Sequence, residues 1–122
     1  MQNELLIQKY GDVTVINFQN ASVLDTNMIE SLGRSLMELV TRQDERKLVL
    51  DFSEVKFMSS QALGILLQLK KAIDKVRGKV VIAGIRPDLH KVFKITNLHK
   101  LFTFRAELDH ALGDFGVYIP KY

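Results

Sequence analysis

The sequence contains no cysteine and no tryptophan, and only two of its 122 residues are proline. Without cysteine the chain has neither disulfides nor thiolate chemistry, which fits a reducing cytoplasm. The longest apolar-rich run, Ala62–Leu69, is interrupted by Gln68 and is too short to span a bilayer. The N-terminal residues, MQNELLIQKYGD, lack the basic start and apolar core of a signal peptide. We therefore expect a soluble, cytoplasmic protein with no direct membrane insertion.

The patterns that mark most enzymes are also missing. The seven glycines form neither a GxGxxG nor a GxxxxGK loop, and the three histidines are isolated from one another. Ser59 and Ser60 are adjacent hydroxyls, but the GxSxG elbow of hydrolases is absent. Asp51 and Glu54 flank a strand end, where an Asp commonly accepts N–H groups of the following loop; acid–base work would need a third partner and a pocket. We expect no catalysis, no cofactor and no metal.

Charge is distributed unevenly along the chain. Residues 1–61 carry 6 Lys/Arg and 9 Asp/Glu, a net charge of −3, whereas residues 62–122 carry 11 and 5, a net charge of +6. A basic half can attract nucleic acid or acidic lipid. Its lysines are scattered among apolar residues at helical spacing, which is typical of a solvated helix face, so no nucleic-acid partner is predicted.

The hydrophobic period alternates between that of strands and that of helices, in the order ββαβαβαβα. This order predicts one α/β domain over residues 1–122, with a hairpin-like strand pair first, then parallel crossovers, and about four helices packed against a central mixed sheet. Its core spans about residues 4–113, and 114–122 form a tail. The predicted strands are Glu4–Lys9, Asp12–Phe18, Lys47–Phe52, Lys79–Ala83 and Leu101–Phe104. The predicted helices are Asn27 to about Val40, Ser60–Arg77 with Gly78 as its stop, Pro87–Ile95 and Ala106–Leu112.

Ser59 and Ser60 lie at a strand-to-helix junction, DFSEVKFMSSQALG, at the edge where open α/β sheets place their functional sites. An N-cap hydroxyl typically contributes about 1 kcal/mol, which accounts for one serine. The second hydroxyl suits modification, because a helix N-terminus tolerates the roughly −1.5 to −2 charges of a phosphate. Gly64, one turn into the helix, indicates close packing on the sheet, an approaching partner, or simple tolerance of glycine.

These residues resemble the core of the STAS domain family, named after sulfate transporters and anti-sigma factor antagonists. The resemblance covers roughly residues 4–113, is strongest over 48–83, and at this chain length is closest to stand-alone bacterial anti-sigma factor antagonists. The usual motif of that subfamily reads approximately F-[MI]-D-S-[ST]-G-L-G. The matching residues are Phe57, Met58, Ser60, Leu63 and Gly64.

The resemblance implies a regulatory phosphoprotein. Its partner would be an anti-sigma factor with serine kinase activity, which binds the unphosphorylated antagonist and releases the phosphorylated one, and a phosphatase would reset the switch. Ser60 falls on the phosphoacceptor, with Ser59 as the alternative. A homodimer is a further option. The implied partner-binding residues are Ser22, Asp25, Met58, Ser59, Ser60, Gln61 and Gly64.

Three departures from the motif keep a second interpretation open. Ser59 replaces the usual Asp, Gln61 replaces Ser or Thr, and Ala62 replaces Gly. The alternative is a STAS scaffold without phosphorylation, such as an accessory subunit of a lipid-transport ABC system, which would also suit the basic second half. A small-molecule binder is a third class, although no residue indicates a ligand.

Overall fold

The computed structural model of the chain describes residues 6–18, 23–24, 26–41 and 45–118, and for residues 23–24 and 26–32 the description covers the backbone alone. Within these residues a five-stranded sheet has the order β1-β2-β4-β6-β7. The first pair is antiparallel and every other pairing is parallel, which confirms the predicted mixed sheet. Its strands are β1 (Leu6–Tyr10), β2 (Val13–Asn17), β4 (Lys47–Asp51), β6 (Lys79–Ala83) and β7 (Thr103–Arg105).

Two further strands, each of two residues, were not predicted. β3 (Val23–Leu24) pairs in parallel with β5 (Phe57–Met58), with Val23 opposite Phe57 and Leu24 opposite Met58. This small sheet joins two loops that are more than 30 residues apart in the sequence. It therefore fixes the segment that leads into the Ser59–Ser60 junction.

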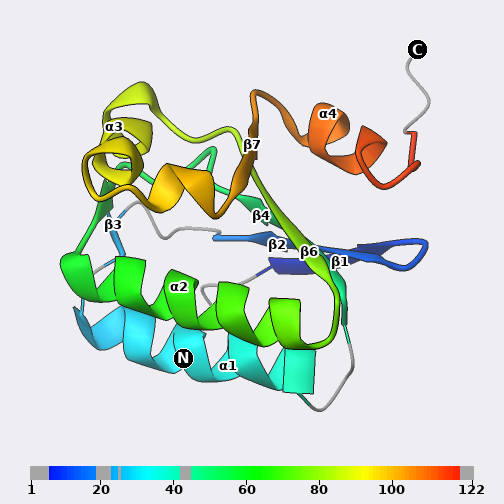
Figure 1. The fold of residues 1–122 in the computed structure, drawn as a ribbon, viewed down its shortest axis with the longest axis horizontal. Coiled ribbons are helices and arrows are strands. Elements are labelled where there is room, and N and C mark those ends of the chain that lie inside the picture. The colour runs from blue at the N-terminus through cyan, green and yellow to red at the C-terminus, as the bar shows by residue number, and fades with distance from the viewer. Residues whose placement is uncertain (1–5, 19–22, 25, 42–44, 119–122) are drawn as a thin grey trace.

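Helices cover both faces of the main sheet (Figure 1). α1 and α2 lie side by side on one face, and α4 lies against the other. No helix in the described ranges is long and apolar enough to cross a membrane. The helices are α1 (Thr26–Thr41), α2 (Ser60–Lys75), α3 (Pro87–Ile95) and α4 (Leu108–Gly113), with a 3-10 helix, η1 (Leu98–Lys100), after α3.

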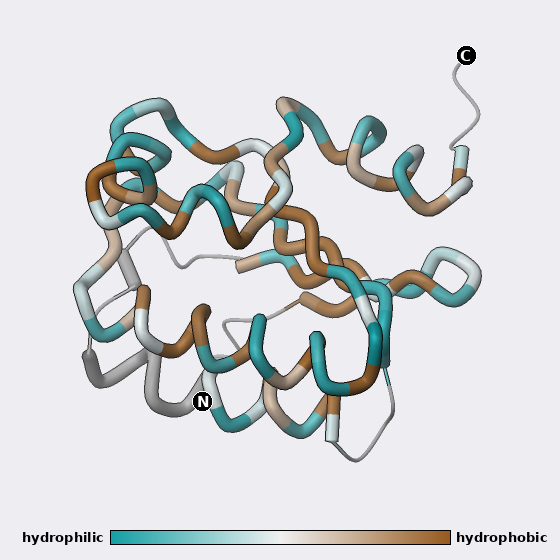
Figure 2. Tube along the Cα trace, in the orientation of Figure 1, coloured by the Kyte–Doolittle hydropathy of each residue, from teal (hydrophilic) through white to brown (hydrophobic). Residues whose placement is uncertain are grey.

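The core consists of two layers separated by the sheet. In β4, Leu48 and Leu50 belong to the larger layer, which includes buried side chains of α1, α2 and α3, whereas Val49 belongs to the smaller layer with Ala111 and Leu112 of α4. Because both faces are covered, the central strands are apolar along their length instead of alternating. Figure 2 shows them as the most continuous hydrophobic stretch of the chain.

The end of α2 differs from the prediction in a way that explains Gly78. The helix ends at Lys75, not Arg77, and Arg77 itself adopts the left-handed conformation, with φ of 59°. Gly78 then passes so close to the preceding loop that a Cβ there would lie 2.3 Å from the carbonyl oxygen of Arg46. The N–H of Gly78 also donates to the carbonyl oxygen of Ile73 at 2.8 Å, and that of Arg77 donates to the carbonyl oxygen of Asp74 at 3.0 Å, so Gly78 takes part in closing the helix as predicted. The left-handed residue is Arg77, and the close approach to Arg46 explains why position 78 is glycine.

The last strand also begins later than predicted. Leu98–Lys100 forms η1, and β7 starts at Thr103, so Leu101 lies in the turn between them and not in the sheet. This turn leaves Leu101 exposed while Phe102 beside it is buried.

Candidate functional site

Ser59 is the N-cap of α2. Its backbone is extended, with φ of −76° and ψ of 164°, and its Oγ accepts the N–H of Ala62 at 3.2 Å. The carbonyl oxygen of Ser59 accepts the same N–H at 3.0 Å. This hydroxyl therefore satisfies one of the N–H groups that a helix leaves unpaired at its start, so capping accounts for Ser59.

The hydroxyl of Ser60 does not cap the helix. It is the first residue of α2, its side chain is exposed, and its hydroxyl forms no hydrogen bond with any residue in the described part of the chain. The first turn of the helix contains no acidic residue. An anion on this oxygen would meet the positive end of a 16-residue helix without a nearby carboxylate in that turn.

Gly64 lies one turn after Ser60, on the same side of the helix, because residues four apart are neighbours on a helix surface. A Cβ at Gly64 would meet no described atom within 4 Å, and the residue is exposed. Close packing against the sheet therefore does not explain this glycine. Gln61 is also exposed, so Ser60, Gln61 and Gly64 form an open strip along the start of α2.

The two apolar residues before the serines face opposite ways. Phe57 exposes 56% of its surface, whereas Met58, which sequence analysis placed in the partner-binding set, exposes 9% and belongs to the core. Sequence reasoning missed Phe57 as a surface residue, because two adjacent apolar residues of a two-residue strand do not show which one faces inward. The exposed aromatic is next to the junction and offers the large apolar contact typical of protein interfaces.

Ser22 and Asp25 lie outside the described residues. The two residues between them, Val23 and Leu24, form β3 and pair with Phe57 and Met58. The backbone of this loop therefore runs beside the junction.

Asp51 has structural partners on both of its oxygens. Oδ1 accepts the N–H of Ser53 at 3.0 Å, and Oδ2 accepts the side-chain amide of Asn17, opposite it in the register of β2 and β4, at 2.9 Å. Glu54 is exposed in the loop. The expectation that Asp51 binds a loop N–H is confirmed, and this carboxylate holds two strand ends and the loop together.

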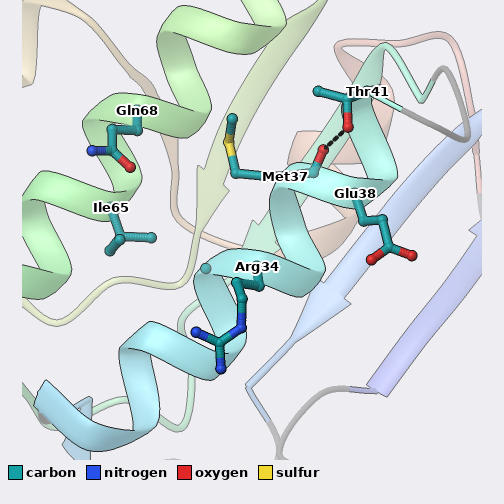
Figure 3. Close-up of a pocket in the computed structure, with 7 residues that line it drawn as sticks. Arg34, Met37, Glu38, Thr41, Ile65 and Gln68 are labelled. Atoms are coloured by element: carbon teal, nitrogen blue, oxygen red, sulfur yellow. Dashed lines mark hydrogen bonds between the residues drawn. The ribbon is translucent and has the colours of Figure 1, made fainter.

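A shallow groove between α1 and α2 is a separate concave surface (Figure 3). It has a volume of about 460 Å³, and its lining mixes the apolar Met37 and Ile65 with Arg34, Glu38 and Gln68. The hydroxyl of Thr41 at its edge donates to the carbonyl oxygen of Met37 at 2.9 Å. None of the junction residues Ser59–Gln61 lines it.

Among the three histidines, His99 has a buried ring nitrogen, Nδ1, with no hydrogen-bond partner in the described part of the chain. The ring of His90 stacks on Phe104 with centroids 4.3 Å apart, and burial, followed by the charges of Lys94 and His99, lowers the pKa of His90. His110 lies within ligating distance of Glu107 and Asp109, but this trio is at the surface of the short helix α4, where Asp109 accepts the backbone N–H of His110.

Comparison with known proteins identifies the family. The STAS domain profile matches residues 4–111. A Bordetella bronchiseptica protein provisionally named anti-sigma factor antagonist BtrV is 24% identical over 107 residues, which are 88% of this chain and 84% of that protein.

Solved structures show the same fold. An anti-sigma-factor antagonist (STAS) domain protein from Planctomyces limnophilus superposes with a TM-score of 0.84 at 19% identity, covering 93% of this chain and 98% of that one. The phosphorylated form of the Bacillus cell fate determinant SpoIIAA superposes with a TM-score of 0.73 at 18% identity, covering 91% and 98%. The chain belongs to the STAS domain family.

Proposed function

We propose that this protein is an anti-sigma factor antagonist whose binding to an anti-sigma factor is switched off by phosphorylation of Ser60. The observation that carries the proposal is that the hydroxyls of Ser59 and Ser60, although adjacent, lie in different structural environments. Ser59 caps the helix, whereas Ser60 is exposed at the helix N-terminus and free of hydrogen bonds to described residues. A phosphate on Ser60 would leave the cap of α2 in place.

The surface around Ser60 suits a partner. Phe57 supplies an exposed aromatic ring, and the bare backbone at Gly64 lets a partner approach α2 closely. A partner that covers this strip must bury the side chain of Ser60, either as a hydroxyl or as a phosphate. Burying a hydroxyl costs little if it finds a hydrogen bond, whereas burying a phosphate without a matching cation costs far more. Phosphorylation would therefore weaken binding by about tenfold or more, without unfolding the domain.

The partner set of the proposal replaces one residue of the set suggested by sequence alone and keeps Ser22, Asp25 and Ser59. Phe57 takes the place of Met58, because a side chain that is 9% exposed offers a partner almost no surface. Gln61 and Gly64 stay in the set, together with Ser60. The phosphate would come from ATP bound by the kinase, since this chain contains no nucleotide-binding glycine loop.

Intact-mass analysis of the protein isolated from its own host, with peptide mapping across residues 55–70, tests the proposal. We expect an added phosphate that maps to Ser60 and disappears in Ser60→Ala. Ser59→Ala is the matched control, since it removes the neighbouring hydroxyl and should keep the phosphate. No phosphate under growth and stress conditions would refute the switch and favour a permanent scaffold, whereas a phosphate on Ser59 alone would refute the assignment to Ser60.

Partner binding provides a second, independent test. Phe57→Ala should weaken capture of the anti-sigma factor while leaving the unfolding midpoint nearly unchanged, because the ring is largely exposed. Ser60→Asp should weaken capture in the same way. If both variants bind as tightly as the unaltered protein, the partner uses another face.

A further inference from the structure

A second exposed surface lies on α3 and the turn that follows η1. We define the α3–η1 surface by Lys91, Lys94, Ile95, Lys100 and Leu101. Ile95 exposes 77% of its surface and Leu101 exposes 43%, and all three lysines are exposed. Figure 2 shows hydrophobic and hydrophilic residues alternating closely along this segment. Residues three and four apart are neighbours on a helix surface, so Lys91, Lys94 and Ile95 lie on one side of α3.

Positive charge is concentrated around this surface. Residues 86–101 contain four Lys/Arg and one Asp/Glu, Asp88, which accepts the Nε–H of Arg86 at 3.2 Å. Among the described residues, Lys91, Lys94 and Lys100 form no ion pair, whereas Lys9, Lys47 and Lys70 each do. The field of this surface is therefore positive and is not neutralised locally.

The inner face of α3 is packed into the core, which leaves Ile95 on the outer face. Leu89 and Phe93 bury the inner face of α3, and the ring of Phe93 packs edge-on against Phe102 and Phe104, with centroids 5.7 and 5.3 Å apart. Thr96 closes the helix by donating its hydroxyl to the carbonyl oxygen of Val92 at 2.9 Å. The fold thus presents Ile95 outward without depending on it for stability.

The geometry points to the α3–η1 surface as a peripheral docking site for an anionic lipid bilayer. Ile95 and Leu101 would enter the headgroup and upper acyl region, and the three lysines would lie among the lipid phosphates. The contact is reversible and shallow, and it requires no segment that spans or inserts deeply into the membrane.

The kinds of residue favour a lipid surface over other anions. Lysine acts as a point charge on a flexible stem and suits a diffuse layer of headgroups, whereas arginine is preferred where a carboxylate or phosphate is held in a fixed bidentate geometry. A nucleic acid would also attract the lysines, but it gives an exposed Ile95 no favourable environment. Binding to a lipid surface should therefore depend on Ile95, whereas binding to nucleic acid should not.

Co-sedimentation with large unilamellar vesicles tests the proposal, using phosphatidylcholine alone and a 3:1 mixture of phosphatidylcholine and phosphatidylglycerol. We expect binding to the anionic vesicles and little to the neutral ones. Ile95→Ser should weaken binding about tenfold through lost apolar burial, and Leu101→Ser should act in the same direction. Each lysine changed to Gln should cost roughly fivefold.

Matched controls separate local docking from general charge. The double variant Lys71→Gln/Lys75→Gln changes the net charge as much as Lys91→Gln/Lys94→Gln but lies on α2, and Ile7→Ser repeats the aliphatic change on β1; both should bind almost normally. Equal losses in the two lysine pairs, or no effect of Ile95→Ser, would overturn the proposal. So would binding of the unaltered protein to a 20-base-pair DNA duplex with no binding to the anionic vesicles.

Discussion

The two serines at the start of α2 should respond differently to alanine. Ser59→Ala removes the hydroxyl that accepts the N–H of Ala62, and loss of such a cap costs about 1 kcal/mol. The carbonyl oxygen of Ser59 still accepts that N–H at 3.0 Å, so the loss should not approach the upper end of the range, about 2 kcal/mol. Ser60→Ala removes no described hydrogen bond and introduces a better helix former, so the free energy of unfolding should stay the same or rise by up to about 0.5 kcal/mol.

Urea unfolding followed by circular dichroism measures the difference. With a slope of roughly 1–3 kcal/mol per M, a loss of about 1 kcal/mol lowers the midpoint by about 0.3–1 M. Ser59→Asn is the control, because Asn caps helices as well as Ser and should restore the midpoint. The reasoning is refuted if Ser60→Ala lowers the midpoint by that amount while Ser59→Ala does not.

Three further substitutions test other parts of the structure. Gly64→Ala should raise the free energy of unfolding by about 1 kcal/mol, since the added methyl meets no described atom, and unchanged stability in urea would contradict this. Gly78→Ala should lower it by at least 1–3 kcal/mol, roughly the cost of overpacking, because the methyl would collide with the backbone of Arg46; an unchanged thermal midpoint would argue against that approach. His90 has a pKa lowered from 6.5, so the unfolded chain binds the proton more readily, and stability should fall as the pH drops below about 6.5. His90→Gln should flatten that dependence in unfolding measured between pH 5 and 8, and an equally steep profile would count against the assignment.

Strongly periodic segments were predictable from the sequence for a clear physical reason. The strand Lys79–Ala83 and the helix Pro87–Ile95 were predicted with the bounds that the structure has. Lys79–Ala83 is short, apolar and enclosed between two glycines, and Pro87 suits only the first turn of a helix. Ser59 was likewise recognisable as a candidate cap, because a hydroxyl before an apolar helical run is a local signal.

Features that depend on tertiary register were not predictable. β3 and β5 have two residues each, so neither shows a period, and only their pairing decides that Phe57 faces solvent and Met58 the core. The requirement for a residue without a Cβ at position 78 depends on the backbone of Arg46, which is more than 30 residues away in the sequence. The exposure of Ile95 was not predictable for a related reason. Its spacing from the other apolar residues of α3 does not show whether the end of the helix is covered by the rest of the fold.

The departures from the usual antagonist motif are compatible with a capped start of α2 beside Ser60. Ala62, in place of glycine, has its methyl buried in the core and donates its N–H to Ser59. Gln61 is exposed and constrains nothing around it. Ser59 supplies the cap that Asp would supply, but without its charge. The substitutions therefore leave α2 capped beside Ser60 and remove one negative charge there.

That change has a measurable consequence in protein phosphorylated at Ser60. Two charges roughly 6 Å apart repel by about 0.7–3 kcal/mol per unit charge, for effective dielectric constants between 80 and 20. Ser59→Asp should therefore keep the unfolding midpoint, because Asp also caps, while raising the second pKa of the phosphate by about 0.5–2 units. A phosphorus NMR titration of the two phosphoproteins gives this difference directly. Identical titration curves would mean that the two side chains point apart, and the loss of the Asp would then have no bearing on the phosphorylated state.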